Sequence, residues 1–320
     1  MNMSVFRFKQ FEVENSASAL KVGTDAVLLG AVVSLGWVNP EARAEAEMPE
    51  EAGTPGPAGK PEEAENPELA EKPERIDAPL KILDVGTGTG VIALMLAQRL
   101  AKKNGSGEAT HSQNSDGDVV RSATFHIDAI DIDGPSAEEA KLNFSRSPWA
   151  EHMVAHHFGL ADWDNGPYDL IISNPPYFEN SLRNPDARES TARHADTLSY
   201  RELCEYAVTG PRTDAGGQTT SRTHLAPADR LPGGLSPDGR LAMILPAEQE
   251  TDLRRTAASF GLYPARIVRI RTTGRKPPKR IVVELSRASG PAAEEELVIQ
   301  KDGEFTPEYR SYVHPFLLYL

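Results

Sequence analysis

Asp84-Val85-Gly86-Thr87-Gly88-Thr89-Gly90 directly follows a strand-like run and directly precedes a helix-like run. Glycines in such a strand–turn–helix unit let the backbone turn tightly and approach a ligand, and the first turn of the helix leaves backbone N–H groups free. A dinucleotide fingerprint needs a further glycine at position 91, where this chain has valine. The loop therefore disfavours NAD and fits S-adenosylmethionine, with a tight structural turn as the alternative. The contacts expected here are Asp84, Gly86, Gly88 and Gly90.

Strand-like and helix-like runs alternate on both sides of this loop, which predicts an α/β fold with a parallel sheet and helices on both faces. The predicted strands are 81–85, 126–132, 154–158, 168–173 and 240–245, and the predicted helices are 91–101, 136–145 and one beginning after Ser199. Ser136 with Glu139, and Ser199 with Glu202, have capping-box spacing. Two β-branched runs, 266–271 and 280–285, are joined by a Gly/Pro/Lys loop and predict a hairpin that completes the sheet.

Acidic residues follow the next two predicted strands. Asp131 stands where a carboxylate can accept hydrogen bonds from ribose hydroxyls, and Asp162 stands where one could reach an adenine amino group. Asp131 comes 45 residues after Gly86, and 24 once the 21-residue polar stretch 102–122 is set aside, against a usual separation of about 20. As alternatives, Asp133 is a solvated acid at a strand end and Asp162 forms a turn.

The most specific motif is Ser173-Asn174-Pro175-Pro176-Tyr177, which follows the apolar run 168–172. Open α/β sheets bind ligands at the carboxyl ends of their strands. Each proline fixes its own φ and makes the preceding residue extended, so Asn174 and the carbonyl of Pro175 are held rigidly. Alone, the motif could be a turn or a proline-rich ligand site; after a buried strand beside the glycine loop, it predicts a catalytic site.

Such a site suits methyl transfer to a planar exocyclic amino nitrogen, most simply on adenine in RNA. The nitrogen lone pair is conjugated with the ring and attacks a methyl sulfonium poorly. If the side-chain oxygen of Asn174 and the carbonyl of Pro175 accept its two N–H bonds, they stabilise the positive charge that develops. Tyr177 can stack on the extruded base.

Charge is unevenly distributed along the 320 residues, whose net formal charge is −13. Residues 41–77 hold twelve acids against four bases, which is −8 of that total, and they are too poor in large apolar residues to form a packed core. By contrast, 254–280 hold nine bases and no acid, so a polyanion could bind there, with an ordinary solvated hairpin as the alternative. The expected RNA contacts are Lys9, Lys21, Arg269, Arg271, Lys276 and Arg280.

Composition excludes several other classes. No apolar run approaches the roughly 18 residues that cross a bilayer, so we expect a cytoplasmic protein without a membrane partner. The single cysteine, Cys204, excludes an internal disulfide framework, and we expect it in the core of a helix. His152, His156 and His157 have no further ligand at metal-binding spacing, so we expect no metal.

These motifs resemble the Asn-Pro-Pro-Tyr class of Rossmann-like amino-nitrogen methyltransferases. Within that class the chain is most similar to the bacterial tRNA1(Val) (adenine(37)-N6)-methyltransferases. The narrower resemblance rests on FRFKQF at 6–11, LKVGTDAVLLGA at 20–31, SPWAE at 147–151 and LIISNPPY at 170–177. It implies a doubly wound, mostly parallel seven-stranded sheet with a C-terminal antiparallel hairpin, S-adenosylmethionine as cofactor, tRNA as partner and a monomer. It also implies cofactor contacts from Thr24 and Asp25, whose alternative role is to cap a buried apolar helix.

Composition and the resemblance together divide the chain into three parts. Residues 1–39 are expected to pack on the catalytic domain, 40–79 to be a disordered acidic Pro/Glu-rich insertion, and 80–320 to be the methyltransferase domain with polar loops near 102–122 and 209–237. The insertion is where the sequence departs from the family pattern.

Three other functions stay open from the residues alone. Protein glutamine N5-methylation poses the same electronic problem, but no helical recognition domain precedes the glycine loop. A non-catalytic RNA-binding module would not need the glycine loop and Asn174 together. A dinucleotide-dependent oxidoreductase is disfavoured by Val91.

Overall fold

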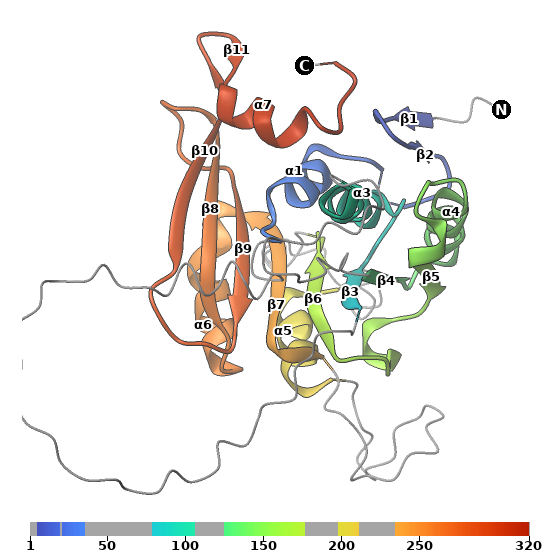
Figure 1. Cartoon of the computed structure of the whole chain (residues 1–320). Coiled ribbons are helices and arrows are strands. Elements are labelled where there is room, and N and C mark those ends of the chain that lie inside the picture. Colours follow the sequence, from blue (N-terminus) through green and yellow to red (C-terminus); the bar gives the residue numbers. More distant parts are fainter. Residues whose placement is uncertain are drawn as a thin grey trace, which may run out of the picture.

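The computed structural model describes residues 5–19, 21–35, 79–105, 125–176, 198–210 and 234–319. Its centre is a nine-stranded sheet in the order β11-β10-β8-β9-β7-β6-β3-β4-β5 (Figure 1). The strands are β3 Leu80–Val85, β4 Phe125–Asp131, β5 Met153–His157, β6 Tyr168–Ser173, β7 Leu235–Pro246, β8 Tyr263–Thr273, β9 Arg280–Ser286, β10 Ala293–Lys301 and β11 Glu304–Phe305. Only β9 and β11 run against the others. A separate two-stranded ribbon pairs β1 Val5–Arg7 with β2 Glu12–Glu14.

The strand order reverses between β3 and β6, and this reversal positions the site. From β3 the chain moves outward to β4 and β5, then returns to place β6 on the other side of β3. Both central strands are buried along nearly their whole length, because helices cover both faces of the sheet at this point. The carboxyl ends of β3 and β6 therefore lie side by side, where open α/β sheets bind their ligands.

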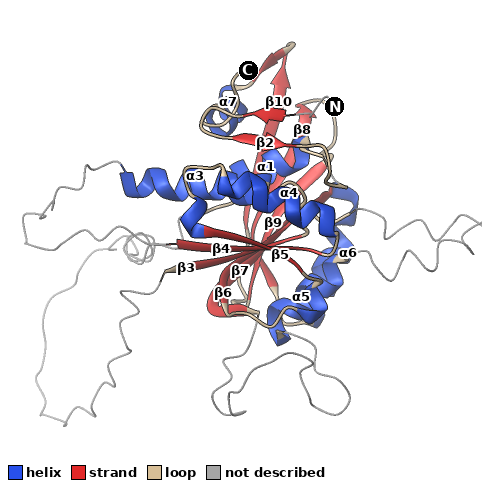
Figure 2. Cartoon of the chain, turned by 90° about the vertical axis from the view of Figure 1, so that its right-hand side faces the viewer, coloured by secondary structure: helices blue, strands red, loops and turns tan. Residues whose placement is uncertain are grey.

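Helices cover both faces of the sheet, as predicted. Two apolar clusters form the core, one between the sheet and α1, α3, α4 and α7, the other between the sheet and α5 and α6. Figure 2 shows α3 and α4 on one side of the strands and α5 and α6 on the other. The helices are α1 Thr24–Val32, α3 Val91–Gly105, α4 Gly134–Ser145, α5 Tyr200–Thr209, α6 Glu250–Ser259 and α7 Pro307–Val313, with short 3-10 turns at Ala150–His152, Leu160–Asp162 and Ala247–Gln249.

The predicted hairpin is present as β8 and β9, and β10 extends the sheet beyond it in parallel to β8. Sequence analysis missed β10, because Glu294, Glu295 and Glu296 in succession are unlike a strand. Arginines of β8 make the pairing favourable: Arg269 contacts Glu294, and Arg271 contacts Glu296, at 2.9 and 2.7 Å.

Local signals predict the start of one helix correctly and that of another wrongly. Ser199 and Glu202 form the predicted capping box of α5, and Cys204 is buried in that helix. The capping box predicted at Ser136 is wrong: α4 begins earlier, with Asp133 as its N-cap, because the Asp133 carboxylate accepts from the backbone N–H of Ser136. Helix α3 also continues to residue 105, into the stretch predicted as a polar loop from 102.

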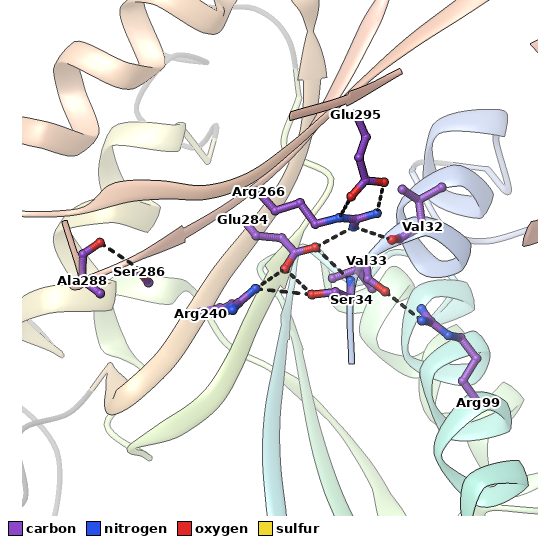
Figure 3. Close-up of polar contacts among 10 residues, drawn as sticks. All are labelled: Val32, Val33, Ser34, Arg99, Arg240, Arg266, Glu284, Ser286, Ala288 and Glu295. Carbon is purple, nitrogen blue, oxygen red and sulfur yellow. Dashed lines mark hydrogen bonds and ion pairs between the residues drawn. The ribbon is translucent and has the colours of Figure 1, made fainter. Parts of the chain in front are cut away.

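A buried carboxylate joins the end of α1 to the sheet (Figure 3). Glu284 on β9 is fully buried and accepts from Arg240, Arg266 and both the backbone N–H and hydroxyl of Ser34. Removing one partner of a buried pair typically costs about 3–5 kcal/mol, because a charge is left uncompensated.

Arginines also cap the end of this helix. Arg99 of α3 donates to the carbonyls of Gly30 and Val33, both at 2.8 Å, and Arg266 donates to that of Val32 at 2.9 Å. Positive side chains suit a helix C-terminus, whose carbonyls have no partner within the helix. The C-terminal end of α1 is thereby fixed to the sheet through Glu284. The insertion expected at 40–79 lies outside the described residues, apart from Pro79.

Candidate functional site

One hydrogen bond sets the glycine loop and Asn174 at the same level. Val85 and Ser173 are paired at the ends of β3 and β6, and the buried Ser173 hydroxyl donates to the Val85 carbonyl at 2.8 Å. The glycine loop leaves β3 immediately afterwards, and Asn174 leaves β6. The two sequence motifs, which are far apart along the chain, thus begin side by side.

The glycine loop adopts a backbone that other residues rarely reach. Gly86, Gly88 and Gly90 have φ of 68°, 56° and 80°. A Cβ at Gly90 would lie 2.5 Å from a ring carbon of Phe144, so this glycine is also required for packing against α4. The backbone N–H groups of Gly86 and Thr87 both donate to the carbonyl of Ile130, at 2.9 and 3.1 Å, which fastens the loop to the end of β4.

Asp131 lies against the loop. Its carboxylate accepts from the backbone N–H of Gly88 at 2.8 Å and of Asp133 at 2.9 Å. Burial raises the pKa of Asp131, although these two hydrogen bonds oppose the rise. A carboxylate offers about four acceptor sites, so Asp131 keeps capacity for hydroxyl donors of a ligand.

Asp84 is buried beneath the loop with one oxygen unsatisfied. Thr87 donates its hydroxyl to one carboxylate oxygen at 2.7 Å, whereas Oδ1 has no hydrogen-bond partner among the described residues. Burial raises the pKa of Asp84 to about 7, and the Thr87 hydrogen bond opposes it. A buried, unpartnered carboxylate oxygen is rare in proteins, and its negative charge would attract a positively charged group bound on the other side of the loop.

Two apolar residues near Asp131 are exposed, and sequence analysis missed both. Ile132 is 56% exposed and Phe158 is 44% exposed, each directly after a strand end. The structure brings Ile132 close to the predicted Asp162: a Cβ at Gly159 would meet Ile132 at 3.6 Å and the Asp162 carboxylate at 3.9 Å. Their exposure could not be read from the sequence, because large apolar residues at strand ends are usually buried. An exposed apolar surface here suits a planar ring.

Of the predicted catalytic residues, Asn174 is half-buried and Pro175 is buried, both directly after β6. Tyr177 lies outside the described residues. Leu198, which precedes α5, lies against the glycine loop: its side chain would be 3.5 Å from a Cβ placed on Gly86.

Thr24 and Asp25 form the first turn of α1, with Gly23 as the N-cap. Helices α1 and α3 run side by side, since Gly30 lies against Met95 and Arg99 reaches the carbonyl of Val33. The N-terminus of α1 is therefore on the same side as the glycine loop.

The structure gives Asp25 a partner that the sequence did not indicate. Its carboxylate accepts from Arg280, the first residue of β9, at 2.9 Å. Arg280 pairs with Pro246 at the end of β7, so the contact lies at the carboxyl edge of the sheet.

The basic stretch is largely neutralised by acids from elsewhere in the chain. Arg269 pairs with Glu250 and Glu294, Arg271 with Glu296, and Arg280 with Asp25. Among the predicted lysines, Lys9 donates to the carbonyl of His314 and Lys21 to that of Ser16, at 2.6 and 2.7 Å. Exposed cations remain in the turn between β8 and β9, at Arg275, Lys276 and Lys279.

Neither a cluster of metal-binding side chains nor a membrane-spanning helix is found among the described residues. It contains no group of three or more His, Cys, Asp or Glu side chains placed to hold a metal ion. None of its helices has the length and apolar character needed to cross a membrane.

Comparison with known proteins identifies the family. No protein-family model matches the chain. A tRNA1(Val) (adenine(37)-N6)-methyltransferase of Bacteroides fragilis is 31% identical over 99% of this chain and 99% of its own length. One of Flavobacterium johnsoniae is 31% identical over 98% of this chain and 99% of its own length. The chain belongs to the tRNA1(Val) (adenine(37)-N6)-methyltransferase family.

Among solved structures, a predicted O-methyltransferase from Agrobacterium tumefaciens has a TM-score of 0.48 and 14% identity, and the match covers 92% of this chain and 98% of that chain.

Family membership confirms the resemblance stated from the sequence. The sheet confirms the predicted fold: strands β5, β4, β3, β6, β7, β9 and β8 are its seven strands, and β10 and β11 extend it.

The residues around the glycine loop fit the cofactor expected of this family, S-adenosylmethionine. The loop offers a backbone surface without side chains, Asp131 offers acceptors for ribose hydroxyls, and Ile132 with Phe158 offers an apolar surface for a purine. The unpartnered oxygen of Asp84 fits a positively charged group. A dinucleotide would need the glycine that Val91 replaces.

We predict that the dissociation constant for S-adenosylmethionine falls as the pH rises through about 7, the pKa of Asp84. Below that pH Asp84 is neutral, and the carboxylate that forms above it attracts the positively charged cofactor. Cofactor binding and ionisation of Asp84 then favour each other. Below the pKa, the dissociation constant should change by up to about tenfold for each pH unit. Titration calorimetry between about pH 5.5 and 8.5 measures the effect.

Asp84→Asn is the matched control, since it keeps the shape and removes the titration. Asp131 is the second carboxyl group whose pKa is raised, so Asp131→Asn measures its separate contribution to the pH dependence of cofactor binding. A pH dependence that persists unchanged in Asp84→Asn would show that another group is responsible.

Proposed function

We propose that this chain transfers the methyl group of S-adenosylmethionine to N6 of adenine 37 in tRNA1(Val), acting as a monomer on cytoplasmic tRNA. The observation that carries the proposal is the placement of Asn174 and Pro175 beside the glycine loop, fixed by the Ser173–Val85 hydrogen bond. Membership of a family whose relatives are named for this reaction supports it.

The cofactor would supply an electrophilic methyl group on a positively charged sulfur. Asp131 would accept from the ribose hydroxyls, Asp162 from the adenine amino group, and Asp84 would face the charged end of the cofactor. Gly86, Gly88 and Gly90 allow the backbone to lie against it. In this arrangement Thr24 is near the loop, whereas Asp25 acts through its contact with Arg280.

The target nitrogen needs acceptors that become more effective as its charge develops. Asn174 Oδ1 and the Pro175 carbonyl would accept its two N–H bonds and hold its lone pair toward the methyl group. As the bond between the nitrogen and the methyl carbon forms, the bond between sulfur and that carbon would break. The positive charge would pass from sulfur to the nitrogen, which would then lose one proton to water. The remaining barrier is lowered by alignment, because two consecutive prolines restrict both acceptors. Tyr177 would stack on the base after it leaves its loop.

The exposed turn between β8 and β9 is the proposed contact for the tRNA backbone. Strand β8 ends at the same edge as β6, three strand positions away, which is roughly 14 Å. Lys276 and Lys279 are exposed in that turn, and the backbone N–H of Ala247 donates to the Lys279 carbonyl, so the turn is held beside the end of β7. Arg269, Arg271 and Arg280 would instead position the turn through their ion pairs.

We predict that Asn174→Ala lowers the single-turnover rate of tRNA methylation by about 10²–10³-fold, since one preorganised acceptor is removed. Cofactor affinity should stay within about twofold, because the hydrogen bond strengthens only as charge develops. Rapid-quench methylation with radiolabelled cofactor, and calorimetry in parallel, give the two quantities.

Asn165→Ala provides the control at the opposite end of β6, where Asn165 is exposed and precedes the strand. It should methylate normally. Near wild-type methylation by Asn174→Ala with cofactor bound would make the Asn-Pro-Pro turn a structural feature only.

We predict that Lys276→Glu/Lys279→Glu weakens tRNA binding and makes it less dependent on salt. The slope of the logarithm of the binding constant against the logarithm of the salt concentration should become shallower by roughly 0.7–0.9 for each phosphate that a lysine no longer neutralises. Lys102→Glu/Lys141→Glu makes the same change in net charge at exposed positions on α3 and α4 and should bind nearly normally. Fluorescence anisotropy with labelled tRNA over a salt series measures both. Equal weakening by the two double variants would mean that only net charge matters.

A further inference from the structure

Residues 14–19, which begin with the last residue of β2, are fastened to α4 through side chains that the proposed reaction does not use. Asn143 and Glu139 of α4 are both buried, at 1% and 5% exposure, although each is polar. Buried polar groups are costly unless they are hydrogen-bonded, so their partners indicate what they do.

Asn143 satisfies its whole amide with backbone groups of two distant segments. Its oxygen accepts from the Glu14 backbone N–H at 2.8 Å, and its nitrogen donates to the Glu14 carbonyl at 3.0 Å. The same nitrogen donates to the carbonyl of Thr89, between Gly88 and Gly90, at 2.9 Å. One buried side chain therefore connects residues 14–19 to the glycine loop.

Glu139, one turn earlier on α4, holds the same segment through hydrogen bonds that do not involve the loop. Its carboxylate accepts from the backbone N–H groups of Ser16, Ala17 and Ser18, at 2.7, 2.7 and 2.8 Å. Burial alone would raise the pKa of Glu139, but these hydrogen bonds outweigh it and lower the pKa, so the side chain is a carboxylate.

We propose that Asn143 is a positioning residue that couples residues 14–19 to the glycine loop, so that cofactor binding and the docking of this segment on α4 favour each other. The inference rests on the proposal that the loop holds the cofactor. Its physical basis is that Thr89 and Glu14 share one amide, so the loop carbonyl and the segment backbone keep their positions only together. Coupling between two sites is reciprocal, which makes the proposal testable from either end.

The decisive variant is Glu139→Gln, because the hydrogen bonds of Glu139 are made to the segment and not to the loop. In this variant an amide nitrogen, which cannot accept a hydrogen bond, replaces one carboxylate oxygen and faces a backbone N–H donor. Residues 16–18 would therefore be held less firmly on α4. We expect a roughly tenfold weaker affinity for S-adenosylmethionine in Glu139→Gln and a weaker one still in Asn143→Ala, in line with the loss of buried hydrogen bonds. Asn143→Asp keeps the side-chain volume but cannot donate to Thr89, so it should be at least as impaired as the alanine variant.

From the other end, S-adenosylmethionine should slow hydrogen exchange of the Ser16, Ala17 and Ser18 amides in the wild-type chain. That protection by the cofactor should disappear in Asn143→Ala. Ser236→Ala is the control for removal of a buried hydrogen bond elsewhere, because Ser236 is buried and donates to Asp169 near the opposite edge of the sheet. It should leave cofactor affinity and cofactor-dependent exchange unchanged.

Asp131→Ala separates this inference from the proposed function. If Asp131→Ala abolishes cofactor binding while Glu139→Gln and Asn143→Asp bind normally, the coupling is wrong and the cofactor site stands. If Asp131→Ala also binds normally, the glycine loop is not the cofactor site. Loss of affinity in Glu139→Gln without any cofactor-dependent protection of residues 16–18 in the wild-type chain would likewise overturn the coupling.

Discussion

The hydrogen bond from the Ser173 hydroxyl to the Val85 carbonyl is the contact on which the site depends. It lies at the point where the order of the strands reverses, and it is buried, so both strands end at one fixed level. The glycine loop and the Asn-Pro-Pro turn are each rigid for local reasons, one through its contacts with Ile130 and Asp131, the other through its prolines. The Ser173–Val85 hydrogen bond fixes them relative to each other. A transfer reaction without strong acid–base catalysis relies on such fixed alignment.

Charged residues outside the site hold its surroundings in place. The buried Glu284 fixes the end of α1 through Ser34, and Asp25 fixes its beginning through Arg280. Helix α1 is thereby attached to the C-terminal half of the sheet at both ends, while Asn143 attaches residues 14–19 to the loop. Buried ion pairs add little net stability compared with apolar packing, but they are highly specific in geometry. This explains why polar groups are used where position matters.

Much of the fold could be predicted because its signals are local. Buried parallel strands are continuous apolar runs, and the strand–turn–helix context of the glycine loop needs no distant partner to be recognised. The features that could not be predicted depend on partners far away in the sequence. Arg269 and Arg271 resemble free cations until Glu250 and β10 are placed beside them, and β10 is too acidic for a strand until β8 neutralises it. The spacing of Glu139 predicts a cap, whereas its side chain binds the backbone of residues 16–18.

At the site, the position of Asp131 could be predicted, because it follows directly from the end of a strand. Ile132 and Phe158 could be identified only from the fold, since the exposure of a side chain is not visible in a sequence.

The most direct test of the central claim is nucleoside mass spectrometry of purified tRNA1(Val) from the organism that encodes this chain, with and without its gene. The account predicts that N6-methyladenosine at position 37 disappears from the deletion strain and returns when the wild-type gene is restored. Persistence of the methyl group at that position, or loss of methylation from a protein glutamine with the tRNA unchanged, would contradict it.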